Sequence, residues 1–150
     1  MGTDADKTLP IEHRVVLRNL GLVDPRSLDD YLAAGGCSGL RRALELGPEG
    51  AIAELEKAGL RGRGGAGFPT AAKWRACRGA ERASSDGADK YAVCNAVDAD
   101  PAARTAHVLI GGDPYGVLEG LLIGAYAVGA SQCFVCINAG YTEEIAALRE

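Results

Sequence analysis

The chain has 150 residues, of which 47% are hydrophobic, and its 16 basic and 20 acidic side chains give a formal net charge of −4. This length fits one domain with a core of ordinary size. A mildly acidic chain is a poor candidate for binding nucleic acids or anionic membranes, which normally requires a basic face, so we expect no nucleic-acid partner. The apolar run of the later helix is short and is interrupted by Glu119, so we expect no membrane insertion. Residues 1–10 are polar and show no signal peptide, which predicts a cytoplasmic protein.

The five cysteines are an odd number without the spacing of a disulfide framework, which fits a reducing compartment. Cys133 and Cys136 form a C-x-x-C, but they lie in residues 132–138, a stretch typical of a buried strand. Side chains three residues apart on a strand point to opposite faces. We therefore predict no metal site and interpret both cysteines as small buried hydrophobes.

The amino-terminal part is expected to be helical after an initial arm. Residues 1–13 are polar and aperiodic, which predicts a flexible arm, and we expect residues 14–150 to form the folded part. Asp24 as the N-cap and Pro25 as the first helical residue predict a helix that stops at the Gly35-Gly36 pair.

Two further helices are predicted in the middle of the chain. One covers residues 48–58 and stops at Gly59, and the other covers residues 70–80. A polar connection over residues 81–90 follows the second of them. The glycine-rich stretch between these helices therefore follows a helix and not a strand.

The last third of the chain predicts two strands and two helices. Residues 91–97 and 133–138 read as buried strands, a helix starts between them at Asp113-Pro114, and a last helix begins at about residue 141. Two strands with a helix between them form a β-α-β unit, but two strands cannot build a sheet covered by helices on both faces. The sequence therefore predicts an α/β fold with an incomplete sheet, which either a longer chain or a partner chain completes.

The glycine-rich loop predicts an anion site. Residues 62–67 hold four glycines, and glycine lets successive backbone N–H groups converge on an anion. Lys73, one turn into the following helix, can supply the balancing positive charge. Gly62-x-Gly64-x-x-Gly67 fits the dinucleotide expression, but the Rossmann fingerprint requires a preceding strand and the Walker motif a closing Gly-Lys-Ser/Thr. The loop is either a tight connection or an anion site, and its basic residues favour the anion site.

An acidic turn follows the first predicted strand. Asn95, Asp98 and Asp100 lie where an α/β sheet binds ligands, outside the carboxyl end of a strand. The same residues also fit a solvated turn before Pro101. Both interpretations stay open on the sequence alone.

The glycine loop together with Lys73-Trp74 resembles the FMN-binding signature of the flavoprotein subunit of respiratory complex I. The same type of subunit serves NAD-linked hydrogenases and formate dehydrogenases as their diaphorase. The likeness spans about residues 13–150, with further matches at residues 16–19, 29–36, 93–96, 112–114 and 119–127.

This resemblance implies a Rossmann-like flavin-binding layer in a subunit that oxidises NADH through FMN and passes electrons to iron–sulfur clusters. It assigns NADH contacts to Phe68 and Asp100. It assigns FMN contacts to Gly62, Arg63, Gly64, Gly65, Ala66, Gly67, Lys73, Asn95 and Asp98. The clusters are expected in a part of the family fold that these residues do not contain, or in partner iron–sulfur subunits beside a catalytic hydrogenase or dehydrogenase subunit.

The chain departs from the family pattern in the acidic turn and just after it. A family aspartate is replaced by valine, two glutamates by aspartates, a glycine by alanine and an Asp-Arg pair by Ala-His, at Val97, Asp98, Asp100, Ala102, Ala106 and His107. Two hypotheses follow: an FMN-dependent, NADH-oxidising subunit or its amino-terminal part, and a shortened, redox-inactive accessory subunit descended from it. A small anion or nucleotide binder that works alone is a weaker third.

Overall fold

A computed structural model describes residues 14–80, 90–100 and 102–149. The arm predicted at residues 1–13 and nearly all of the connection predicted at residues 81–90 lie outside these ranges. The described part forms, in chain order, α1 (Leu28–Ala33), α2 (Ser38–Lys57), α3 (Thr70–Gly79), β1 (Tyr91–Ala96), α4 (Thr105–Gly112), α5 (Pro114–Val128), β2 (Gln132–Ile137) and α6 (Thr142–Ala147).

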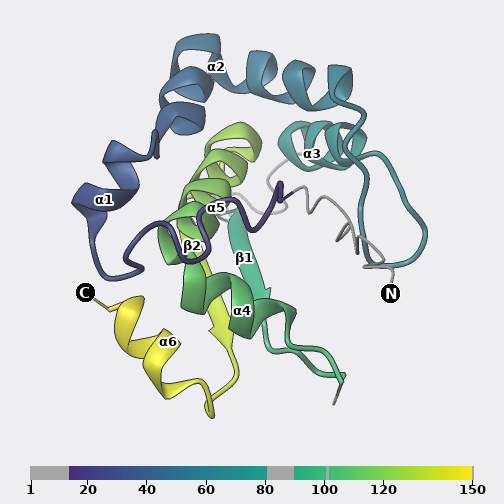
Figure 1. Cartoon of the computed structure of the whole chain (residues 1–150). Coiled ribbons are helices and arrows are strands. Elements are labelled where there is room, and N and C mark those ends of the chain that lie inside the picture. Colours follow the sequence, from purple (N-terminus) through teal and green to yellow (C-terminus); the bar gives the residue numbers. More distant parts are fainter. Residues whose placement is uncertain (1–13, 81–89, 101, 150) are drawn as a thin grey trace, which may run out of the picture.

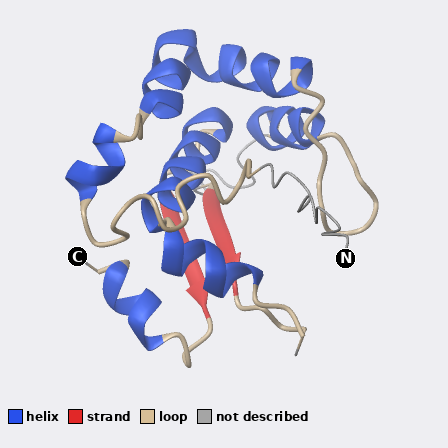
Figure 2. Ribbon diagram, in the orientation of Figure 1, coloured by secondary structure: helices blue, strands red, loops and turns tan. Residues whose placement is uncertain are grey.

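The two strands form a parallel sheet, in register from Tyr91 opposite Gln132 to Ala96 opposite Ile137. Because parallel neighbours need a crossover, α4 and α5 run between them, and Figure 2 shows the two strands side by side among the helices. The predicted β-α-β unit and the incomplete α/β sheet are thus confirmed within the described residues.

The hydrophobic core lies where α2, α3 and α5 meet. Small residues and one isoleucine let these helices approach closely, and Figure 1 shows α2 above the upper end of α5 and α3 beside it. The partly buried residues Leu55, Trp74, Ile123 and Tyr126 pack around this cluster, whose buried members are Ala43, Ala51, Ile52, Ala71 and Ala127. The core is therefore helical, and the sheet lies to one side of it.

The amino-terminal helices begin at other residues than predicted. Asp24 does not cap a helix: its side chain accepts the Arg26 amide at 2.9 Å in a turn, and α1 begins after Ser27, whose hydroxyl accepts the Asp30 amide at 3.1 Å. The second helix is longer than predicted, because a first segment starts at Ser38 and joins the predicted one across a kink at Gly47, where φ is 73°.

A carboxylate from α5 caps the first segment of α2. Glu119 accepts the amides of Cys37 at 2.9 Å and Leu40 at 2.8 Å, and it also accepts the hydroxyl of the buried Tyr31. Burial by itself would raise the pKa of Glu119, but the hydrogen bonds from Tyr31 and the α2 amides outweigh it and hold the pKa below its ordinary value. Burial and this carboxylate raise the pKa of Tyr31.

The later helices include one that the sequence did not predict. The start of α5 matches the prediction, since Asp113 accepts the Gly116 amide at 2.9 Å and Pro114 is the first helical residue. Helix α4, just before it, was not predicted. None of the described helices is by itself long and apolar enough to cross a membrane, although α4 and α5, bent by 103°, meet the requirement of length and composition as a pair.

The prediction that both strands are buried is wrong. Side chains alternate across a sheet, and one face carries Tyr91, Val93 and Phe134, which are 54%, 58% and 47% exposed. The rings of Tyr91 and Phe134 lie 5.8 Å apart on this face, which we call the open sheet face. Cys133 and Cys136 are exposed as well. These strands look buried in the sequence because they carry apolar residues on both faces, whereas the described residues cover only one face.

Candidate functional site

The glycine loop is fixed at its base between α2 and α3. The Gly62 amide donates to the Phe68 carbonyl at 2.9 Å, and the Thr70 amide donates to the Leu60 carbonyl at 2.9 Å. The guanidinium of Arg61 also donates to the Gly67 carbonyl at 3.0 Å. In Figure 1 the loop forms a wide arc between the ends of the two helices. The base is therefore closed by hydrogen bonds, and the tip extends beyond it.

The tip of the loop uses glycine where its backbone requires it. Gly65 and Gly67 have φ values of 118° and 59°, in a region that favours glycine. Within the described part of the chain, no amide from Arg63 to Phe68 donates a hydrogen bond to another residue. A row of backbone donors is thus left for water or for a ligand.

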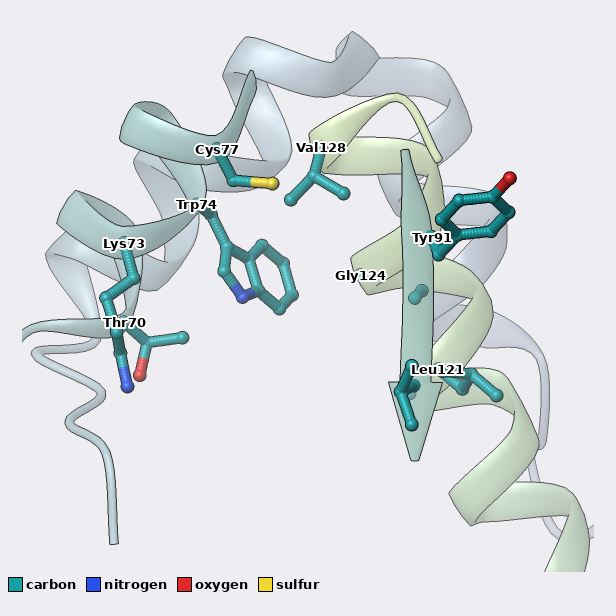
Figure 3. A pocket seen from close by; sticks show the side chains of 11 residues that line it. Thr70, Lys73, Trp74, Cys77, Tyr91, Leu121, Gly124 and Val128 are labelled. Atoms are coloured by element: carbon teal, nitrogen blue, oxygen red, sulfur yellow. The ribbon is translucent and has the colours of Figure 1, made fainter. Parts of the chain in front are cut away.

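Lys73 places its ammonium against this loop. A Cβ built on Gly62 would lie only 2.6 Å from the Lys73 Nζ, so the glycine makes room for the ammonium group. Figure 3 shows Lys73 and Thr70 on α3 pointing toward the same end of the cleft. The predicted pairing of the glycine loop with Lys73 is therefore present in the structure.

The basic residues near the glycine loop divide into those that form ion pairs with α2 and those that do not. Arg75 pairs with Glu56 at 2.6 Å and Arg78 with Glu49 at 2.7 Å, which ties α3 to α2. Neither Arg63 nor Lys73 forms an ion pair with any residue that the structure describes. Two positive charges beside a row of free amides make this loop suited to an anion.

An apolar cleft of about 390 Å³ lies between α3, the edge of β1 and α5. Trp74 and Cys77 point into it from α3, as Figure 3 shows, and Leu121 lines it from α5. A Cβ on Gly124 would lie 3.3 Å from the Trp74 ring, so this glycine permits the indole to come close to α5. Lys73 lines the same cleft, so a charged group and an apolar surface lie next to each other.

Asn95 and Asp100 lie exposed at the carboxyl end of β1. The Asn95 side-chain oxygen accepts the Val97 amide at 3.2 Å, and its NH₂ group makes no hydrogen bond to a described residue. The Asp100 carboxylate accepts the Ala102 amide at 3.0 Å. Both side chains remain open to solvent or to a ligand, as the sequence predicts for this turn.

Asp98, in contrast, is engaged by the protein itself. Its carboxylate accepts the amides of Ala106 and His107 and the hydroxyl of Tyr141, each at 3.1 Å. The hydrogen bond from the Ala106 amide, followed by those from His107 and Tyr141, lowers the pKa of Asp98 despite the opposing effect of burial. A direct contact of Asp98 with a cofactor stays a prediction, and its hydrogen bonds serve α4 and Tyr141 instead.

The predicted site residues therefore fall into two groups. The glycine loop, Lys73 and the half-exposed Phe68 form one, and Asn95 with Asp100 forms the other. No hydrogen bond or ion pair among the described residues joins them, so a ligand that contacts both would have to bridge them. Tyr141 was not predicted as a site residue; its one signal in the sequence is its place just after β2, at the same edge of the sheet as the acidic turn.

Comparison with known proteins finds relatives along most of the chain. The family model of the Nuo51 FMN-binding domain matches residues 55–150. The NADP-reducing hydrogenase subunit HndC of Solidesulfovibrio fructosivorans is 42% identical over 137 residues, which cover 91% of this chain and 27% of HndC. A subunit of the NADH-quinone oxidoreductase of Aquifex aeolicus is 37% identical over 124 residues, which cover 83% of this chain and 28% of the Aquifex protein.

The fold is also found in a solved structure. A chain of the NAD⁺-reducing NiFe hydrogenase, in its air-oxidised state, superposes with a TM-score of 0.66 at 27% identity and covers 92% of this chain and 22% of its own length. The chain thus spans about a quarter of the length of the curated relatives given above. The family match over residues 55–150 and identities of 42% and 37% show that the chain belongs to the Nuo51 FMN-binding domain family.

Proposed function

We propose that this chain supplies the phosphate-binding loop and part of the flavin pocket of a subunit that oxidises NADH through FMN. The observation that carries this proposal is the ammonium of Lys73 set against Gly62, beside loop amides that have no partner among the described residues. The FMN-binding domain family and the Aquifex relative, a subunit of an NADH-quinone oxidoreductase, support the same function, and HndC is named for an NADP-reducing hydrogenase.

The residues of the loop fit a flavin mononucleotide at its phosphate end. A phosphate monoester carries nearly two negative charges at neutral pH, and Lys73 and Arg63 offer two positive charges without partners among the described residues. Amides between Arg63 and Phe68 supply donors that reach a phosphate without a side chain in between. We therefore assign the phosphate grip to residues 62–67 and Lys73.

The other predicted contacts complete this pocket. The NH₂ group of Asn95, which donates to no residue that the structure describes, can donate to a carbonyl or ring nitrogen of the flavin. Phe68 is 53% exposed and offers a ring face for the dinucleotide, and Asp100 offers a solvent-facing carboxylate. When FMN is bound, it supplies the step that the side chains cannot, because it takes two electrons together and releases them singly.

This function implies partners and a compartment. An NADH-oxidising flavin unit needs an electron acceptor, so we place iron–sulfur subunits and a catalytic hydrogenase or dehydrogenase subunit beside it. All five cysteines lie in the described residues as free thiols, which fits the reducing cytoplasm. The incomplete sheet is consistent with assembly into a larger unit, since a parallel sheet is normally covered on both faces.

A second candidate function is a redox-inactive accessory subunit descended from this family. The arrangement of Asp98 favours it, because the carboxylate predicted to contact the flavin is instead bound by α4 and Tyr141. Reduction of an artificial dye by NADH distinguishes the two functions. We expect the native complex to reduce the dye, and a complex that contains FMN but does not reduce it would establish the accessory function.

The phosphate grip is tested by replacing the ammonium. In the native complex, Lys73→Gln should weaken FMN binding by roughly 10- to 150-fold, because one charge-assisted hydrogen bond contributes about 1.5–3 kcal/mol. Binding of riboflavin, which has no phosphate, should not change. Lys57→Gln is the matched control, since Lys57 pairs with Glu54 on the exposed side of α2.

Two results would contradict the assignment of Lys73 to the phosphate, and a third would contradict the function itself. If Lys73→Gln left FMN affinity unchanged, the ammonium would not bind the phosphate. If riboflavin and FMN lost affinity equally, Lys73 would act on the pocket in general and not on the phosphate. Absence of flavin from the wild-type complex would refute the proposed function as a whole.

A further inference from the structure

Four polar side chains gather at the carboxyl edge of the two strands. Tyr141 donates to Asp98, and the rings of His107 and Tyr141 lie 4.9 Å apart. The His107 Nδ1 lies 2.8 Å from a carboxylate oxygen of Glu144, whose side chain is 8% exposed. These residues come from the turn after β1, from α4 and from the start of α6. We call them the edge cluster.

Asn138 joins the turns after the two strands a second time. Its backbone amide donates to the Ala96 carbonyl at 3.3 Å, and its side chain donates to the Val97 carbonyl at 3.3 Å. With the bond from Tyr141 to Asp98, three hydrogen bonds among the described residues link the segment that follows β2 to the last residue of β1 and the turn after it. The edge of the sheet where α/β proteins bind ligands is therefore tied together by the chain itself.

Asp98 acts as the cap of α4 from outside the helix. The residue at the N-cap position, Arg104, makes no side-chain capping bond, and the Asp98 carboxylate accepts the Ala106 and His107 amides in its place. The backbone of Asp98 has a φ of 49°, a left-handed conformation that costs a non-glycine residue on the order of 1 kcal/mol. Its three hydrogen bonds hold it in that conformation.

We propose that Asp98 is a positioning residue of the candidate site, not a ligand of the flavin, and that it acts together with Tyr141. By fixing the left-handed turn, Asp98 sets where Asp100, two residues after it, stands relative to Asn95, which the pairing of β1 with β2 holds in place. This inference rests on the proposed function for the flavin, but the tie between the turn, α4 and α6 does not.

The experiment compares Asp98→Asn and Tyr141→Phe with wild type in the native complex. An asparagine has one acceptor oxygen, and its NH₂ group cannot accept the second α4 amide. Loss of a helix cap lowers the stability of the helix by about 1 kcal/mol, so hydrogen exchange in residues 105–108 should accelerate at least about fivefold in Asp98→Asn. Tyr141→Phe should accelerate it less and in the same direction. Asp24→Asn, which alters an exposed turn far along the sequence, is the control.

FMN binding supplies the second readout. We expect Asp98→Asn and Tyr141→Phe both to weaken FMN binding, the first by about five- to tenfold, while the absorption spectrum of the bound flavin stays that of wild type. The combined effect in the double variant should be smaller than the sum of the two single effects, because the Tyr141 hydroxyl and the His107 amide share the same Asp98 oxygen.

The opposite pattern would overturn the inference. If Asp98→Asn changed the spectrum or the affinity of the flavin while exchange in residues 105–108 stayed at the wild-type rate, and Tyr141→Phe changed neither, Asp98 would be a direct ligand. If the wild-type complex binds no flavin, the proposed function fails, and hydrogen exchange alone then decides whether Asp98 holds α4. An exchange rate in Asp98→Asn equal to that of wild type overturns the inference. A faster exchange rate supports the part of the inference that concerns the turn and α4.

Discussion

Because Gly62 lies against the ammonium of Lys73, the substitution Gly62→Ala, which adds one methyl group, tests the phosphate grip. Gly62→Ala would place a Cβ 2.6 Å from the Lys73 Nζ, well inside van der Waals contact. The backbone of Gly62 is not left-handed, so alanine fits its conformation. Because Nζ is the far end of a flexible side chain, we expect the ammonium to swing away and the fold to stay intact.

The expected size follows from this displacement. The substitution should change the free energy of unfolding by no more than about 0.5 kcal/mol, as for other surface positions without strain. It should also remove one charge-assisted hydrogen bond to the phosphate, which contributes about 1.5–3 kcal/mol, and so raise the Kd of FMN by roughly 10- to 150-fold. A large loss of binding with almost no loss of stability is therefore the predicted signature.

Fluorescence titration of the deflavinated native complex with FMN and with riboflavin measures the effect. Gly79→Ala at the end of α3 is the matched control, since a Cβ there meets no atom within 4 Å, its backbone is not left-handed and it lies outside the phosphate grip. The loss in Gly62→Ala should be confined to FMN. Equal losses for FMN and riboflavin, or an FMN affinity like that of wild type, would refute the argument that the ammonium next to Gly62 binds the phosphate.

Two other predictions concern stability and assembly. Glu119→Gln should lower the free energy of unfolding by about 1–3 kcal/mol at pH 7, because a charged acceptor of the Tyr31 hydroxyl and of the Cys37 and Leu40 amides becomes neutral. The fold lowers the pKa of Glu119, so the stabilisation by its carboxylate is complete above about pH 4.3, the pKa in an unfolded chain, and disappears as the pH falls through the lower pKa of the folded state. The melting temperatures of variant and wild type should therefore converge in acid. A difference in melting temperature that stayed constant with pH would contradict this. Expressed without partners, the chain should aggregate through its open sheet face, and Phe134→Ser should raise the fraction that stays in solution, whereas a sharp, cooperative melt of the unmodified isolated chain would show that this face needs no cover.

Features that depend on nearby residues could be predicted from the sequence. Asp113 and Pro114 signal the start of α5 because the cap and the capped amide are three residues apart. The glycine loop and Lys73 are near each other in the sequence, so their pairing in space was predictable too. The β-α-β order likewise follows from the succession of apolar stretches and helical signals.

Features that depend on distant residues could not. The carboxylate that caps the first segment of α2 comes from Glu119, 79 residues after Leu40, and the one that caps α4 comes from Asp98 before the helix. No local signal marks either helix start, and both were missed. The role of Asp98 escaped for the same reason, because its partner Tyr141 is 43 residues away. The exposure of the strands depends on whether other elements cover each face of the sheet, and the residues of the strands alone do not show this.

The ion pairs between α2 and α3 have a consequence for how the anion grip forms. Arg75 and Arg78 on α3 pair with Glu56 and Glu49 on α2, which lie 19 and 29 residues earlier in the chain. The glycine loop connects these two helices. The orientation of the glycine loop is therefore set by α2 and α3, two helices that are adjacent in the sequence. The proposed phosphate grip and the incomplete sheet are therefore formed by separate parts of the described chain.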